Sequence, residues 1–399
     1  MRNSCFFFLV LSLTHLAAEP SLWEGGFTTK VGYDSNPRAS GSGSSEVLGD
    51  FDAVTWSGAI NVALRLPKGR LAYAGEQVVF DGLPQENFRL HRLALVQALK
   101  GAGWRAGIDA STVFVDGSKD DLASTSGVNA NGLALWRERR NQLQHRLKAH
   151  ALLEEGSIGF ARATVAVLDY DYRTHVQSGC VSFTDRRDAV VGLEMGRRVD
   201  SGWILGVRAG KQRQATIPLP GGGFEYSNRY HRVLLGWEAR PQAGRSFSFA
   251  AGPEFRRFTG AVDPLVMPDR RERSLWFEAA GTLPLSRTAG LTAKAMQWTF
   301  LSSTGKSAYR DLSFDVAATW TPHPVVTLSL GARAQEADYF PALRDDWHAA
   351  VTASARIKLT HRLLLTLDLL RHEGWNGLAG TTGRSFQRTG VTLGATRTF

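Results

Sequence analysis

The chain has 399 residues, with 47 Lys and Arg against 37 Asp and Glu, and a formal net charge of +10 at pH 7. Such a basic excess is common in proteins that bind nucleic acids or anionic surfaces. The export signal described next argues against nucleic acid. Only one of the two cysteines, Cys180, lies beyond that signal, so no disulfide within the mature chain is expected.

Residues 1–18 have the features of a secretory signal peptide. Arg2 precedes an apolar run over 5–13, and small residues end at Ala18, where we expect cleavage. The run is too short to cross a bilayer as a helix, and no later stretch approaches the roughly 18 consecutive apolar residues that a membrane helix needs. If residues 19–399 lie in a membrane, they must do so as a closed β-barrel. No linker divides them, so we expect one domain.

Most of the remaining chain alternates apolar and polar residues. Within 54–66, Val54, Trp56 and Ile60 share one face, opposite Thr55 and Arg65. The same alternation starts again, in chain order, at Trp104, Trp203, Val233, Phe247, Leu275, Leu312, Val326, Trp347 and Leu363. Because successive side chains of a strand point to opposite sides, this period of two predicts strands with one apolar and one polar face.

The connections between these segments alternate in length. Short turns with Gly or Pro are expected near 67–70, 100–103, 154–157, 199–202, 240–244, 285–290, 321–324 and 360–362. Longer polar stretches are expected near 36–50, 81–87, 116–131, 173–186, 214–228, 258–272, 303–309, 338–346 and 372–385. Short periplasmic turns and longer extracellular loops are typical of outer-membrane barrels. We therefore predict an all-β fold, a transmembrane antiparallel β-barrel of about 18 strands, with 16 as the alternative.

The two ends of the mature chain carry a resemblance to known barrels. The last segment places Val391 and Leu393 on the same face as the terminal Phe399. A terminal aromatic resembles the signal that outer-membrane barrels present to their assembly machinery, although Arg397 replaces the usual apolar residue. Near the other end, the string Gly32-Tyr33-Asp34-Ser35-Asn36 resembles the opening of porin-like families, including β-barrel porins of the exopolysaccharide-associated type. The resemblance implies a Gram-negative outer-membrane location and transport, without catalytic residues.

Tryptophans lie next to the expected turns. Trp104 and Trp203 follow short turns, whereas Trp237 and Trp320 precede them, all on apolar faces. This placement predicts an inner aromatic girdle, with Trp347 nearer the outer one. In a soluble β-sandwich, the alternative fold, aromatics would more often lie in the middle of strands.

If the apolar faces contact lipid, the opposite faces line a lumen. The predicted pore-lining residues are Arg65, Arg105, Asp109, Arg146, Lys148, Arg162, Arg198, Arg208, Arg232, Glu238, Arg256, Asp315, Arg333, Arg356 and Arg388. The excess of positive charge predicts a preference for anions. At any one position the alternative is an ion pair between Arg and a carboxylate that only satisfies a polar wall.

Signatures of catalysis are missing from the sequence. It has no Gly-x-Ser-x-Gly, His-Glu-x-x-His or phosphate-binding Gly-rich motif. His145 and His150 are five residues apart, so they point to opposite faces of a strand and are not expected to share a metal ion. We therefore expect no enzyme activity, catalytic residue, metal or cofactor.

These patterns together predict a passive, porin-like channel for small, preferably anionic solutes. The alternatives are a conduit that exports an acidic exopolysaccharide, and a structural or adhesive barrel with a plugged lumen. The expected partners are outer-membrane lipids and lipopolysaccharide, the barrel-assembly machinery, and small or polymeric anionic solutes, but no nucleic acid. Assembly into a homo-oligomer stays open.

Overall fold

A computed structural model describes most of the chain. The described ranges are 22–36, 52–84, 87–117, 142–155, 159–172, 185–197, 201–214, 226–242, 244–259, 271–301, 308–340, 344–378 and 384–399. The predicted leader, Cys180 and Arg198 lie outside these ranges.

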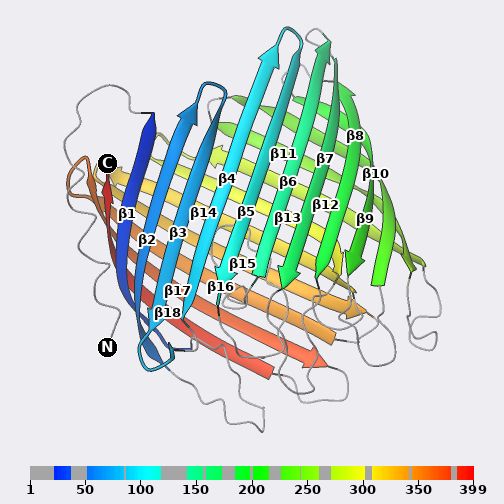
Figure 1. The fold of residues 1–399 in the computed structure, drawn as a ribbon. Coiled ribbons are helices and arrows are strands. Elements are labelled where there is room, and N and C mark those ends of the chain that lie inside the picture. Colours follow the sequence, from blue (N-terminus) through cyan, green and yellow to red (C-terminus); the bar gives the residue numbers. More distant parts are fainter. Residues whose placement is uncertain are drawn as a thin grey trace.

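Eighteen strands make up a single sheet (Figure 1). They are β1 (Trp23–Asp34), β2 (Ala53–Leu66), β3 (Gly69–Phe80), β4 (Phe88–Gly101), β5 (Trp104–Asp116), β6 (Gln142–Glu155), β7 (Gly159–Tyr172), β8 (Arg186–Arg197), β9 (Ser201–Gln214), β10 (Tyr226–Gln242), β11 (Arg245–Thr259), β12 (Arg271–Pro284), β13 (Ala289–Leu301), β14 (Ala308–His323), β15 (Val326–Phe340), β16 (Arg344–Lys358), β17 (Leu363–Leu378) and β18 (Arg384–Thr398). Each strand pairs antiparallel with its neighbours in the sequence.

The sheet closes on itself because β1 pairs with both β2 and β18. At the junction the backbone N–H of Phe399 donates to the carbonyl of Gly25 at 3.0 Å, and the N–H of Gly25 donates back at 3.3 Å. Figure 1 shows the earlier strands crossing in front of the later ones, as expected for tilted strands on opposite walls. The predicted closed antiparallel barrel of 18 strands is confirmed.

Connection lengths differ between the two ends of the barrel. One end has short connections such as 67–68, 102–103 and 324–325, and the opposite end has long ones such as 35–52 and 117–141. The expected long stretch at 338–346 is wrong, because β15 continues to Phe340 and β16 begins at Arg344. The charged residues at these strand ends resemble loop residues in the sequence, which led to the wrong expectation. One of them, Asp346, is buried inside the barrel.

The outer face of the barrel is apolar and exposed. On β9, Trp203, Leu205 and Val207 point outward and are exposed, whereas the alternate Ile204 and Gln212 are buried. Leu235 on β10 is 64% exposed. An apolar surface continuous around many strands is far larger than soluble monomers show. Within the described ranges, no helix is long and apolar enough to cross a membrane.

One seam of the barrel is only partly paired. The ladder between β12 and β13 runs from Pro284 and Gly290 to Phe277 and Gln297 and stops there. Beyond it, the side chain of Gln297 donates to the carbonyl of Leu275 at 2.7 Å. The end of β13 then stays paired with β14 and also approaches β9. The end of β13 thus separates from β12 and, with β14 still paired to it, bends into the interior.

Candidate functional site

Contacts between strands that are not neighbours identify the inner face. Arg162 on β7 lies 3.5 Å from Glu238 on β10, and Lys30 on β1 lies 3.0 Å from Asp368 on β17. Side chains from strands three apart in the sheet, such as β7 and β10, can meet in this way only across the interior. The register places these further predicted wall residues on the same face: Arg65, Arg105, Asp109, Arg146, Lys148, Arg208, Arg232, Arg256, Asp315, Arg333, Arg356 and Arg388.

Part of the inner face is exposed and rich in unpaired positive charge. On β4 to β6, Arg92, Lys100, Arg146 and Lys148 are exposed, and none forms an ion pair with another described residue. Val96, on the same face, is 49% exposed, so the interior is open here. Arg356 and Lys358 add two exposed cations on β16.

Alternation did not predict Arg92 and Lys100 as part of this wall. Their strand, β4, has no clean polar face: Arg89, His91 and Gln97 point outward, whereas Val96 points inward. The two faces of β4 follow from its pairing with β3, in which Leu93 lies opposite the outward Tyr73. That pairing is visible only in the structure, so the sequence held no signal for these two residues.

Near the short connections the predicted cations are partly neutralised. Glu24 on β1 accepts from Arg65 and from Arg70, each at 2.8 Å. Arg105 pairs with Glu154 on the neighbouring β6. These side chains remain accessible, so water screens their interaction.

Deeper in the wall, two predicted arginines share one buried carboxylate. Glu194 on β8 accepts from Arg162 Nε at 2.7 Å and from Arg208 Nη2 at 2.7 Å. Its side chain is 2% exposed. Arg162 also lies 3.5 Å from Glu238 and Arg208 lies 3.9 Å from Glu278, so carboxylates balance both cations at this point.

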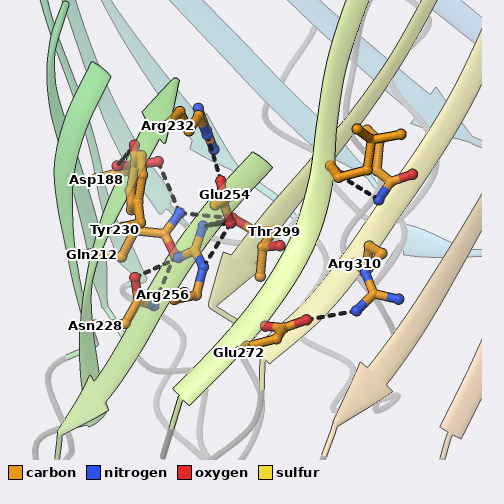
Figure 2. Close-up of polar contacts among 12 residues, drawn as sticks. Asp188, Gln212, Asn228, Tyr230, Arg232, Glu254, Arg256, Glu272, Thr299 and Arg310 are labelled. Atoms are coloured by element: carbon orange, nitrogen blue, oxygen red, sulfur yellow. Dashed lines mark hydrogen bonds and ion pairs between the residues drawn. The ribbon is translucent and has the colours of Figure 1, made fainter. Parts of the chain in front are cut away.

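A second cluster of this kind is fully buried. Arg232 and Arg256 both bind Glu254, and the exposed fractions of the three side chains are 0%, 0% and 1%. Figure 2 shows Arg256 beside Gln212 and Asn228 as well, and its Nη1 donates to Gln212 at 2.7 Å and also to Asn228. From the sequence these two arginines were expected to face lumen water, and the structure instead buries them.

Aromatic rings cover the Arg232 guanidinium. It lies 4.4 Å from the ring centre of Tyr230 and 4.4 Å from that of Trp298, with Trp276 at 5.1 Å. Cations over aromatic faces are attracted by the ring quadrupole, most strongly where water is excluded. Trp276 and Trp298 were not predicted as inner-face residues. The sequence could have predicted the inward position of Trp276, because Trp276 lies between Leu275 and Phe277, which point outward.

The buried cluster extends across the interior to the end of β13. The carbonyl of Thr299 accepts from Gln212 Nε2 at 2.9 Å and from Arg256 Nη2 at 3.4 Å, and the carbonyl of Leu301 accepts from Arg186 at 2.9 Å. Phe258 on β11 meets Phe340 on β15 edge to face, with ring centres 5.8 Å apart. The interior is therefore filled near the long connections on this side of the barrel.

The remaining predicted wall residues are either largely buried in ion pairs or exposed to the lumen. Arg388 donates to Asp34 through Nε at 3.0 Å, and Arg333 lies 3.5 Å from Asp315, with all four side chains largely buried. Asp109 is exposed on β5, across from Lys148 of β6.

The predicted girdle tryptophans are exposed on the outer face. Trp104, Trp203, Trp237 and Trp320 are between 41% and 52% exposed and lie near the short connections. Trp203 and Trp237 are direct cross-strand partners. Trp347 lies toward the opposite end, as the partner of Trp375. Their contact with a membrane interface stays a prediction, as does the role of Phe399 in assembly.

Within the part of the chain that the structure describes, no group of three or more His, Cys, Asp or Glu side chains is arranged to hold a metal ion. His145 points outward and bonds Thr112 at 3.0 Å. His150 occupies the opposite face, next to Gly107.

No family model and no curated protein matches the sequence. Several solved structures match with low identity. OccAB4 of Acinetobacter baumannii is 9% identical with a TM-score of 0.43, over 94% of this chain and 98% of that chain. The siderophore receptor PirA of Pseudomonas aeruginosa is 8% identical with a TM-score of 0.38, over 94% and 80%. OmpTdeltaL8, a loop-deletion mutant of an outer membrane protein of Vibrio cholerae, is 10% identical with a TM-score of 0.33, over 94% and 98%. At these values the likeness supports no statement about function.

Proposed function

We propose that this chain forms a channel in the outer membrane of a Gram-negative cell and lets small solutes diffuse passively, with a preference for anions. The observation that carries the proposal is the exposed, unpaired basic wall of β4 to β6, formed by Arg92, Lys100, Arg146 and Lys148. One exposed carboxylate, Asp109, lies among them.

The membrane location is supported by the outer surface. Exposed aliphatic side chains such as Leu193, Val207 and Leu235 would be costly in water, and hydrocarbon solvates them. A closed barrel satisfies its backbone hydrogen bonds without water, as a membrane demands. The longer connections would then lie outside the cell, because outer-membrane barrels keep their short turns in the periplasm.

The preference for anions follows from which cations are paired. Buried arginines that share a carboxylate, such as Arg232 and Arg256 on Glu254, act mainly within the wall. Exposed unpaired cations act on ions within about one Debye length, roughly 8 to 10 Å at physiological salt. The wall of β4 to β6 therefore attracts anions and raises the barrier to cations.

Ion selectivity tests the proposal. Purified protein in a planar bilayer should conduct, and its reversal potential in a KCl gradient should favour chloride. The double variant Arg146→Glu with Lys148→Glu should shift the reversal potential toward cation selectivity, because it places negative charge on the wall. A matched control, Arg287→Glu with Arg362→Glu, makes the same charge change in exposed turns and should shift it much less. A silent or cation-selective native protein would refute the anion channel.

A barrel with a plugged interior is the second candidate. It is favoured by the buried contacts that Arg186, Gln212 and Arg256 make with the end of β13. Silence in the same bilayers, from protein shown to be folded, would favour this candidate over the channel.

A further inference from the structure

A row of cations crosses the outer face of four neighbouring strands. Lys211 on β9 pairs in register with Arg229 on β10, Arg229 pairs with Arg257 on β11, and Arg257 pairs with Arg271 on β12. Arg273 lies two residues further along β12. All five side chains are exposed. We call these five residues the outer basic row.

This arrangement is unfavourable for the barrel alone. Directly opposed side chains on neighbouring strands have Cβ atoms about 5 Å apart, and like charges at that distance destabilise the sheet. No residue of the outer basic row forms an ion pair with another described residue. Of the carboxylates that the structure describes on β7 and β12, Asp169 binds Arg187 at 2.8 Å and the inward Glu272 binds Arg310 at 2.6 Å.

The outer basic row lies where the apolar surface ends. Along β10 the outward side chains run from Trp237 through Leu235 and Val233 to His231 and then Arg229. On β11 and β12 the last outward apolar residues before the row are Phe255 and Leu275. The row also lies at the barrel end that carries the long connections 215–225 and 260–270.

We propose that the outer basic row binds the phosphate groups of lipid A, the membrane anchor of lipopolysaccharide. This inference rests on the proposed outer-membrane location and orientation. Guanidinium groups bind phosphate oxygens in a bidentate way that matches their planar donors. Bound phosphates would remove the repulsion between Arg229, Arg257 and Arg271, and the acyl chains would pack along Leu235, Phe255 and Leu275 below.

The site offers cations for phosphate groups and, next to them, an apolar surface for acyl chains. This combination fits lipid A rather than free phosphate. Inorganic phosphate would meet only the charges, whereas lipid A carries phosphate and hydrocarbon in the same order as the barrel surface presents arginine and apolar side chains. On the neighbouring β8, Ala189 is in register with Lys211, and the outward Arg187 two residues away is paired with Asp169 of β7, so these two strands offer no comparable excess of positive charge.

Lipid binding to the purified barrel tests this site. Native mass spectrometry of the full-length protein with bisphosphorylated lipid A should show a retained lipid. The triple variant Arg229→Gln, Arg257→Gln and Arg271→Gln should bind roughly 100-fold more weakly, because each basic residue near an anionic lipid contributes about five-fold. A matched triple variant of the inner wall, Lys100→Gln, Arg146→Gln and Lys148→Gln, should bind as tightly as the native protein.

Further measurements keep the test decisive. With the unchanged protein, lipid A stripped of its phosphates should bind weakly, and inorganic phosphate should not displace the intact lipid at equal concentration. Equal binding of the stripped lipid, displacement by phosphate, or native binding by the folded outer triple variant would overturn the proposal. The heat-dependent gel migration of folded barrels shows whether each variant is folded.

Selectivity measured on the same variants separates this site from the channel. The outer triple variant should keep the reversal potential of the native protein. A barrel that conducts selectively but fails to hold lipid A would overturn only the lipid site. One that holds lipid A but does not conduct would overturn only the channel.

Discussion

At the scale of single residues, the buried charges are the costly feature of this barrel. Arg232, Arg256 and Glu254 have almost no contact with water, so each has lost its hydration. Removing one partner of such a group leaves an uncompensated charge, which costs far more than the pair contributes. The cluster is therefore stable only when complete.

Glu254→Gln tests this dependence. It keeps the size of the side chain but removes the carboxylate that ion-pairs with both buried arginines, so we expect a loss of about 3 to 5 kcal/mol in the free energy of unfolding. Urea titration of the protein in lipid vesicles measures the loss. Glu24→Gln, which breaks the accessible pairs with Arg65 and Arg70, serves as the control and should change the unfolding midpoint much less. Equal effects of the two substitutions would contradict this account.

Alternation predicted the direction of Arg232 but not its environment. A period of two tells which side of the strand a residue occupies, and Arg232 does point inward. Its burial depends on Trp298 of β13, which lies 66 positions later in the chain. Trp298 reaches Arg232 only because β13 bends inward. Nothing local to Arg232 encodes that contact.

At the scale of strands, the seam between β12 and β13 is the weak point. In an antiparallel strand the N–H and C=O of one residue face the same neighbour. Leu275 directs its carbonyl toward Gln297, so the amides of Leu275 and Arg273 face the side where the ladder has ended. The amides of Ala279 and Gly281 face the same side within the ladder.

Residue-resolved hydrogen exchange should detect this difference. We expect the amides of Arg273 and Leu275 to exchange roughly tenfold or more faster than those of Ala279 and Gly281, because unpaired backbone is least protected. The seam between β16 and β17, which is paired from Arg344 to Lys358, provides the comparison and should be protected throughout. Uniform protection along β12 would show that the ladder continues in solution.

Register also explains why the outer basic row is invisible in the sequence. Lys211, Arg229, Arg257 and Arg271 are scattered over 61 positions, and each by itself is an ordinary exposed residue near a strand end. They form a row only because three successive ladders align them. A shift of one residue in any ladder would turn part of the row inward.

At the scale of the whole molecule, the interior is divided. The side formed by β4 to β6 is open and basic, whereas contacts between β8 to β11 and β13 to β15 fill the other side near the long connections. The edge-to-face pair of Phe258 and Phe340 joins β11 to β15 there, and Phe258 is fully buried. Among the described residues, only the side of β4 to β6 leaves room for a solute path at this level.

Weakening that packing should widen the path. Replacing a buried phenylalanine by alanine typically costs about 3 to 5 kcal/mol, so Phe258→Ala with Phe340→Ala should loosen the filled side. We expect a higher single-channel conductance, measured in planar bilayers at fixed salt. The control Phe249→Ala removes an outward ring from β11 and should leave conductance unchanged. Unchanged conductance in the folded double variant would show that the packed side does not limit the path.

The sequence by itself determined most of the strands, their two faces and most of the alternation of short and long connections, because these depend on the period of two and on local turn residues. It also predicted a closed barrel, because strands with one apolar and one polar face alternate with short and long connections and no apolar run is long enough for a membrane helix. Only the tertiary structure decided which cations are paired, where β13 leaves β12, and how the outer arginines line up. These features depend on register and on contacts between distant strands, and side-chain periodicity within one strand carries no information about either.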